Sequence, residues 1–235
     1  MTSLLSPAEW SALWLSATVA LWASAVLVVP GIALGWLLAR CQFPGKLLVD
    51  ALVHLPLVLT PVVVGYLLLL LVGRNGWLSP VLGDLGLRLA FSYPGAVLAA
   101  AVVALPLVVR SVRTAIELVD PGLEEAAAVL GAGPLRRFWK ITLPLALPGI
   151  VAGLVLGYAR SLGEFGATIT LAGNIAGQTR TLPIAIYTAI QVPGGETEAL
   201  RLTGLSILLS LIALATSEWL LRRLRDRVRH ERGGR

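Results

Sequence analysis

Charged side chains are scarce in this sequence of 235 residues, in which Asp, Glu, Lys and Arg together make up 14%. A soluble domain of similar length carries about 25% charged residues. Hydrophobic residues make up 57% of the chain, and the mean hydropathy is +0.83. This balance excludes an ordinary soluble domain and predicts a single all-α membrane domain of about five, at most six, spanning helices.

Cysteine and histidine are nearly absent. The single cysteine, Cys41, excludes a disulfide within the chain, and we interpret it as an inert thiol near the membrane surface. His54 and His230 are too few and too far apart for a zinc site, so we expect no bound metal. We interpret His54 as a packed or interfacial side chain, with a role in gating or proton sensing as the alternative.

Motifs of common enzymes are missing as well. The sequence contains no G-x-x-x-x-G-K-[ST], no H-E-x-x-H and no G-x-S-x-G. It therefore predicts no ATPase of the P-loop kind, no catalytic residue and no cofactor bound by this chain. A membrane-embedded enzyme or a secondary carrier remains a distant alternative, because Glu164 is the only carboxylate deep within an apolar run.

Long apolar runs fill most of the sequence. Residues 10–39 carry no charge, and as a helix they would be about 45 Å long, against a hydrocarbon core of roughly 30 Å. This segment must tilt, kink near Pro30 or extend beyond the lipid. Prolines within the runs favour kinked helices whose neighbours satisfy the freed carbonyls. The further predicted spans are 51–73, 89–109, 148–171 and 202–221.

One apolar segment, 181–191, is too short to cross a bilayer. We interpret it as a partial or re-entrant helix on the external side, and a sixth span is the alternative.

The basic residues lie at the ends of the apolar runs, which argues against nucleic acid as a partner despite the net charge of +6. Fourteen fall on one side of the predicted membrane and four on the other, so the first side is cytoplasmic. Five spans then place the N-terminus outside and the basic tail, 222–235, inside. The cytoplasmic residues are Arg40, Lys46, Arg110, Arg113, Arg136, Arg137, Lys140, Arg222, Arg223, Arg225, Arg227, Arg229, Arg232 and Arg235, and the external ones are Arg74, Arg88, Arg180 and Arg201.

The predicted cytoplasmic loop, 110–147, is far longer than a turn requires. Pro121 and the acidic pair Glu124 and Glu125 are typical of a helix start, since acidic side chains favour the positive end of the helix dipole. Gly131 would end that helix. The pattern predicts a short helix on the membrane surface, with small alanines that allow another protein to approach closely.

This loop resembles the EAA motif of ABC importer permeases, E-A-A-x3-G-x9-I-x-L-P. The matching residues are Glu125, Ala126, Ala127, Gly131, Ile141, Leu143 and Pro144. The resemblance implies the fold of type I ABC importer permeases, in which this loop forms a coupling helix that docks on an ATPase subunit. It thereby assigns ATPase coupling to these residues and to Glu124, with an ordinary amphipathic surface helix as the alternative.

A second stretch, 159–168, resembles the signature of molybdate permeases and of their sulfate-permease relatives. The likeness extends from about Trp10 to Trp219. It implies an importer of molybdate or tungstate in a bacterial inner membrane: a homodimer of this chain, two cytoplasmic ATPase subunits that bind ATP and Mg²⁺, and an external oxyanion-binding protein. A sulfate or thiosulfate permease, which usually pairs two different permease chains, is the alternative.

Two ionisable residues, Arg160 and Glu164, lie within that stretch and four residues apart, so they are expected to share one helix face. We interpret them as an ion pair, within one helix or between subunits, that could stabilise a state of the gate, or as a purely structural pair. Gly163 and Gly166 would permit close helix packing. The candidate residues of the translocation path and gate are Arg160, Gly163, Glu164, Phe165, Gly166 and Thr168.

Overall fold

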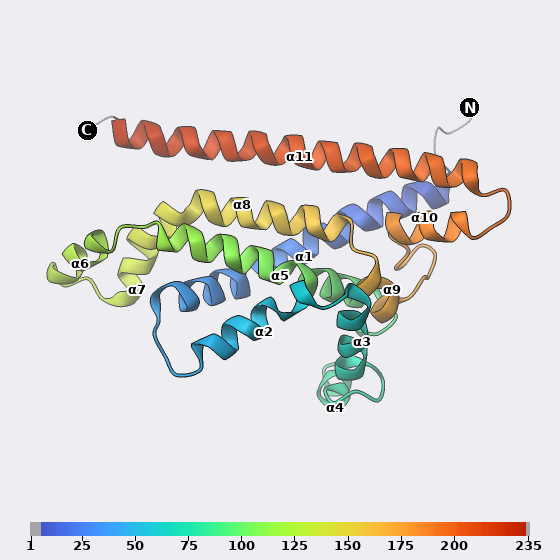
Figure 1. Ribbon diagram of the computed structural model, residues 1–235, viewed down its shortest axis with the longest axis horizontal. Coiled ribbons are helices and arrows are strands. Elements are labelled where there is room, and N and C mark those ends of the chain that lie inside the picture. Colours follow the sequence, from blue (N-terminus) through green and yellow to red (C-terminus); the bar gives the residue numbers. More distant parts are fainter. Residues whose placement is uncertain (1–5, 234–235) are drawn as a thin grey trace.

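The computed structural model describes residues 6–233, with side chains at all of them except 220–221 and 224–233. Within that range the chain is entirely helical and has no strand, as the composition predicts (Figure 1). Most basic side chains of the predicted tail, 222–235, lie outside the described residues. The helices are α1 (Pro7–Arg40), α2 (Lys46–Val58), α3 (Pro61–Val72), α4 (Ser79–Asp84), α5 (Tyr93–Glu117), α6 (Pro121–Val129), α7 (Pro134–Arg137), the π-helical η1 (Phe138–Thr142), α8 (Leu143–Leu162), α9 (Gly166–Ala172), α10 (Leu182–Ile190) and α11 (Glu196–Gly233).

Four helical segments are long and apolar enough to cross a membrane, and α2 with α3 would form a fifth, bent span. The four are Pro7–Arg40, Tyr93–Glu117, Pro134–Leu162 and Glu196–Trp219. α1 starts in a capping box between Ser6 and Glu9 and runs through Pro30 without interruption. It has 34 residues, so at 1.5 Å per residue it is about 51 Å long and exceeds the hydrocarbon core.

The predicted span 51–73 is not one continuous helix. It is divided into α2 and α3, which meet at 118°. Thr60 has an extended backbone (φ −64°, ψ 142°), because the ring of the following Pro61 disfavours helical geometry at the residue before it. Pro61 then starts α3, where its missing N–H costs nothing.

α5 is the central helix and packs against both α1 and α8. Glycines at four-residue spacing let the neighbouring backbones approach it. A Cβ at Gly31 of α1 would lie 2.7 Å from Cγ1 of Val108, and one at Gly157 of α8 would lie 2.7 Å from Cγ2 of the same valine. The hydroxyl of Ser111 donates to the carbonyl of Gly149 at 3.0 Å and ties α5 to α8.

Both edges of the predicted loop 110–147 are helical instead. α5 continues to Glu117, and an unbroken helical segment runs from Pro134 to Leu162. The predicted span 148–171 is itself interrupted after Leu162, and the chain resumes as the short helix α9. The predicted span 89–109 corresponds to α5, which starts at Tyr93 and continues to Glu117. The predicted span 202–221 lies within the longer helix α11.

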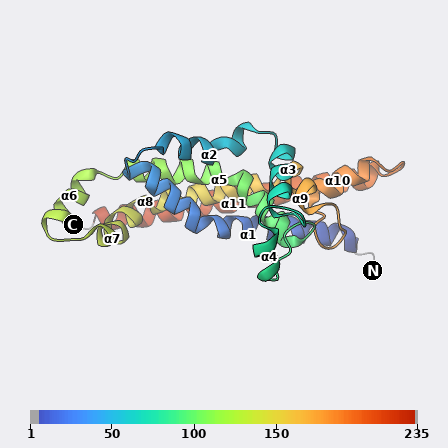
Figure 2. The same ribbon diagram turned by 90° about the horizontal axis from the view of Figure 1, so that it is seen from below.

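The two ends of the helix bundle carry different elements. The start of α1 lies with α10 at one end, the α10 end, and α6 and α7 lie at the other, the α6 end, in both views (Figures 1 and 2). At the α10 end, Arg201 of α11 forms an ion pair with the buried Glu9 of α1 at 3.0 Å. α10 has only nine residues, so the segment predicted as too short to cross forms a helix about 14 Å long.

Candidate functional site

The helix α6 has defined signals at both ends. The carboxylate of Asp120 accepts from the backbone N–H of Gly122 at 2.9 Å, and Pro121 takes the first helical position. At the other end Gly131 adopts a left-handed conformation (φ +83°), and the N–H of Ala132 reaches back to the carbonyl of Ala127 at 2.9 Å. This is a Schellman ending, and it explains why the motif requires glycine at this position.

α6 stands away from the bundle. None of its residues is buried, and Val129 and Leu130 are 88% and 87% exposed. Glu125 and Ala126 are exposed as well. An apolar, small-residue surface of this kind is suited to contact with another protein.

Glu124 points the other way, toward the bundle. One oxygen of its carboxylate accepts from the guanidinium of Arg40 at 3.2 Å and from the hydroxyl of Thr142 at 2.6 Å. Arg40 also donates to the carbonyl of Val119 at 2.9 Å. This Glu124 clamp therefore joins α6 to the last residue of α1 and to η1, directly before α8.

The remaining motif residues lie where η1 passes into α8. The N–H of Leu143 bonds to the carbonyl of Phe138, five residues back, and Pro144 follows with no N–H to donate. A π-helical turn accommodates a proline ring that would clash with the carbonyl four residues earlier. Ile141 is half-buried in this wide turn. This turn thus joins α7 to the long helix α8 in one unbroken helical segment, Pro134–Leu162.

The predicted pair of Arg160 and Glu164 forms within one chain, at 2.8 Å, with 31% and 2% of the two side chains exposed. The two residues do not share one helix, because α8 ends at Leu162 and Gly163 is not helical. The second oxygen of Glu164 accepts from the N–H of Ala167 at 2.8 Å and thereby caps α9. Glu164 thus holds the break between α8 and α9.

α9 crosses α3 at very short range. A Cβ at Gly65 of α3 would lie 2.8 Å from Cα of Ala167, and one at Gly166 would lie 3.0 Å from the backbone nitrogen of Val62. Only glycine fits at either position without a backbone shift. Gly163 differs from the prediction, since nothing in the described chain lies within 4 Å of its would-be Cβ.

Most polar side chains beyond this crossing are buried or hydrogen-bonded within the chain. Thr168 is buried, and the hydroxyl of Thr170 donates to the carbonyl of Gly166 at 2.7 Å. Asn174 bonds to Thr188 and Arg180. The ring of Phe165 packs on that of Tyr187, with centroids 5.0 Å apart.

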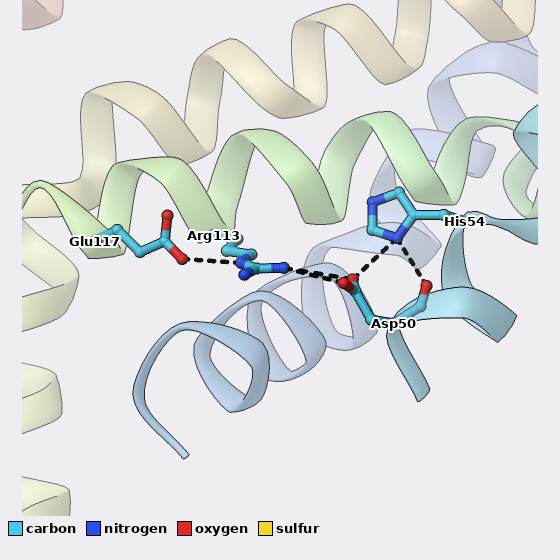
Figure 3. Close-up of polar contacts among 4 residues, drawn as sticks. All are labelled: Asp50, His54, Arg113 and Glu117. Atoms are coloured by element: carbon cyan, nitrogen blue, oxygen red, sulfur yellow. Dashed lines mark hydrogen bonds and ion pairs between the residues drawn. The ribbon is translucent and has the colours of Figure 1, made fainter. Parts of the chain in front are cut away.

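Sequence reasoning missed a cluster of four side chains between α2 and α5 (Figure 3). Arg113 lies between two carboxylates: its Nε donates to Glu117 at 2.8 Å and its Nη1 contacts Asp50 at 3.3 Å. The Nδ1 atom of His54 faces the backbone and side-chain oxygens of Asp50 at 2.9 and 3.2 Å, so it carries the hydrogen. The spacing of four residues within each pair was visible in the sequence, but the contact between the helices was not.

Among residues with described positions, no group of three or more His, Cys, Asp or Glu side chains is placed to hold a metal ion. Cys41 is a half-buried free thiol.

Comparison with known proteins identifies the family of this chain. The family of binding-protein-dependent transport system inner membrane components matches residues 31–229. The chain belongs to this family. It is therefore a multi-pass protein of the inner membrane.

Relatives within the family share high sequence identity. The molybdenum transport system permease protein ModB of Escherichia coli (strain K12) is 56% identical over 225 residues, which cover 95% of this chain and 98% of that protein. The sulfate transport system permease protein CysW of Synechococcus elongatus is 42% identical and covers 75% of this chain and 63% of its own length.

A solved bacterial alginate ABC transporter, in complex with a periplasmic protein bound to alginate pentasaccharide, aligns with a TM-score of 0.74. The identity is 20%, and the alignment covers 93% of this chain and 80% of that one. This likeness confirms the predicted fold, that of the permease subunits of type I ABC importers.

Proposed function

We propose that this chain is the permease subunit of an ATP-driven importer for molybdate, with tungstate as an equivalent substrate. The single observation that carries the proposal is its 56% identity to a molybdenum permease over nearly the whole of both chains. Identity to the sulfate permease is lower and covers less of either chain, so sulfate is the second candidate.

In this proposal two copies of the chain enclose the path, and two cytoplasmic ATPase subunits supply the work. An external oxyanion-binding protein delivers the anion. The α6 end then faces the cytoplasm and the α10 end faces outward, in agreement with the fourteen basic residues predicted on the inner side. ATP and Mg²⁺ bind the partners, and this chain needs no cofactor of its own.

The exposed side of α6 is suited to docking on the ATPase, and the Glu124 clamp would carry its displacement into α1 and α8. Two features support this route. Val129 and Leu130 are free to contact a partner, and one carboxylate oxygen of Glu124 contacts both Arg40 and Thr142. In this proposal the exposed side of α6 contacts the ATPase, and the side that carries Glu124 contacts the rest of the chain.

The test is ATP hydrolysis by the complete transporter in proteoliposomes with its binding protein. We expect molybdate and tungstate to stimulate hydrolysis and sulfate to have little effect. Stimulation by sulfate alone would favour the second candidate, and a complex of two different permease chains would contradict the homodimer.

A further inference from the structure

α5 runs between α2 and α8 (Figure 1). Exposed side chains of α5 form a strip between these two helices. Arg110 and Thr114 lie on this strip, four residues apart, and both are exposed. They line a cavity of about 300 Å³ on the α2 side and a second of about 380 Å³ on the α8 side. The two cavities adjoin at these residues, and we call the region that they form together the α5 groove.

The two arginines of this region differ in their partners. Arg113 is neutralised by Asp50 and Glu117. Arg110 makes no hydrogen bond or ion pair with any described residue, and neither does the hydroxyl of Thr114. The two carboxylates balance the two arginines in number, but only Arg110 has its N–H donors free. A guanidinium presents several N–H donors in a planar fork that matches an oxyanion.

A second cation, Arg160, lies beyond the residues that line the groove and is paired with Glu164. Leu156 of α8 lines the cavity, and Arg160 is one turn beyond it on the same face. Gly157 packs on Val108, which fixes the register of α8 against α5. Arg160 thus lies roughly 10 Å from Arg110 along the helix axis, at 1.5 Å per residue. Ionisable groups at membrane depth normally face a partner or a water-filled cavity. Arg160 has Glu164 as its partner, whereas Arg110 has only the groove.

We propose that Arg110, with the hydroxyl of Thr114, is a contact site for the transported oxyanion on the α6 side of Arg160. The inference rests on the proposed function and adds a residue to it. One free cation and one hydroxyl in an open groove bind a divalent anion weakly. Transport requires such weakness, because an anion held tightly would not leave.

Uptake by the complete transporter in proteoliposomes tests the site. We expect R110Q to lower molybdate uptake at limiting concentration about tenfold, because a charge-assisted contact is lost, and R110K to retain most of it. K46Q is the matched control, since Lys46 is a cation at the start of α2 that lines neither cavity. We expect it to transport normally.

A second measurement reports the charge without transport. In a C41S background, T114C places the only thiol of the chain in the groove. We expect a negatively charged methanethiosulfonate to react faster than a positively charged one, and R110Q to lower that ratio about tenfold. Molybdate should protect the thiol while Arg110 is present.

The outcomes separate the two proposals. If the unsubstituted transporter imports no molybdate, the proposed function falls and this inference falls with it. If it imports molybdate and R110Q does so equally well with an unchanged reagent ratio, only this inference is overturned. A defect of R110Q that varies with the content of anionic phospholipid, and not with molybdate, would assign Arg110 to a lipid phosphate and also overturn it.

Discussion

The α6 end and the crossing of α3 with α9 are held together by different forces. At the crossing, Gly65 and Gly166 bring two backbones together, and the buried Glu164 caps the helix break. At the α6 end, a helix with no buried residue is attached through the carboxylate of Glu124. Close packing tolerates almost no change in shape, whereas polar contacts can be rearranged. The crossing is thus suited to a fixed pivot and α6 to a movable arm.

The largest effect should follow G65L, which would force a side chain into the backbone of Ala167. Overpacking of this kind typically costs about 1–3 kcal/mol, and contact with backbone places this site at the upper limit. We expect the purified complex to unfold at a markedly lower temperature. G163A is the control, because the space around Gly163 is open. Equal stability of the two variants would contradict the tight crossing.

The next effect concerns the buried carboxylate. E164Q keeps an oxygen for the N–H of Ala167 but leaves Arg160 without its counter-charge. We expect a loss of about 2 kcal/mol, less than for a fully buried pair because Arg160 is partly exposed, and slower uptake. Thermal unfolding and molybdate uptake measure the two parts. Normal uptake would refute a role of this pair in the gate.

The Glu124 clamp predicts a loss of coupling with only a small loss of stability. We expect T142V, which removes the hydroxyl that bonds Glu124, to lower uptake per ATP hydrolysed about threefold, and E124Q about tenfold, the equivalent of about 1.4 kcal/mol. T142S keeps the hydroxyl and should restore coupling. Uptake and hydrolysis are measured on the same vesicles. A T142S variant as defective as T142V would contradict the clamp.

The smallest effect should come from the pair that joins α2 to α5. Asp50 and Arg113 are each about one-third exposed, and such pairs contribute about 1 kcal/mol or less. We expect D50N and R113Q each to lower the stability of the protein slightly, and by less at high salt. The loss in the double variant should not exceed the sum of the two single losses. Unfolding at two salt concentrations measures this. A large effect independent of salt would show that Asp50 or Arg113 has another role.

Much of this molecule follows from patterns that are local in the sequence. Helix α6 is confirmed where Pro121 and Gly131 predict its ends. The ion pair of Arg160 with Glu164 also forms, although across the end of α8 and not on one helix face as the spacing predicted. The break at Gly163 is not predictable in this way, because α8 ends there through the packing of α9 on α3. Prolines at positions 56 and 61 indicate a disturbed span, and Pro61 accounts for the break at Thr60, but these local signals do not specify the 118° angle.

Contacts between distant segments escape such reasoning altogether. Arg40 lies 84 positions before Glu124, and Asp50 lies 63 before Arg113. Neither pair has a sequence spacing that would predict a contact. Which of two adjacent glutamates faces the bundle depends on the angle at which α6 is attached. The identical charges of Glu124 and Glu125 therefore conceal two different roles.

Site-directed crosslinking at Ala126, on the exposed side of α6, tests the central claim most directly. A126C in a C41S background should crosslink to the ATPase subunit in the intact transporter, with a yield that changes when ATP is bound. Reaction of the same thiol with a membrane-impermeant reagent applied from the external side, or the absence of any crosslink to a second protein, would contradict the account.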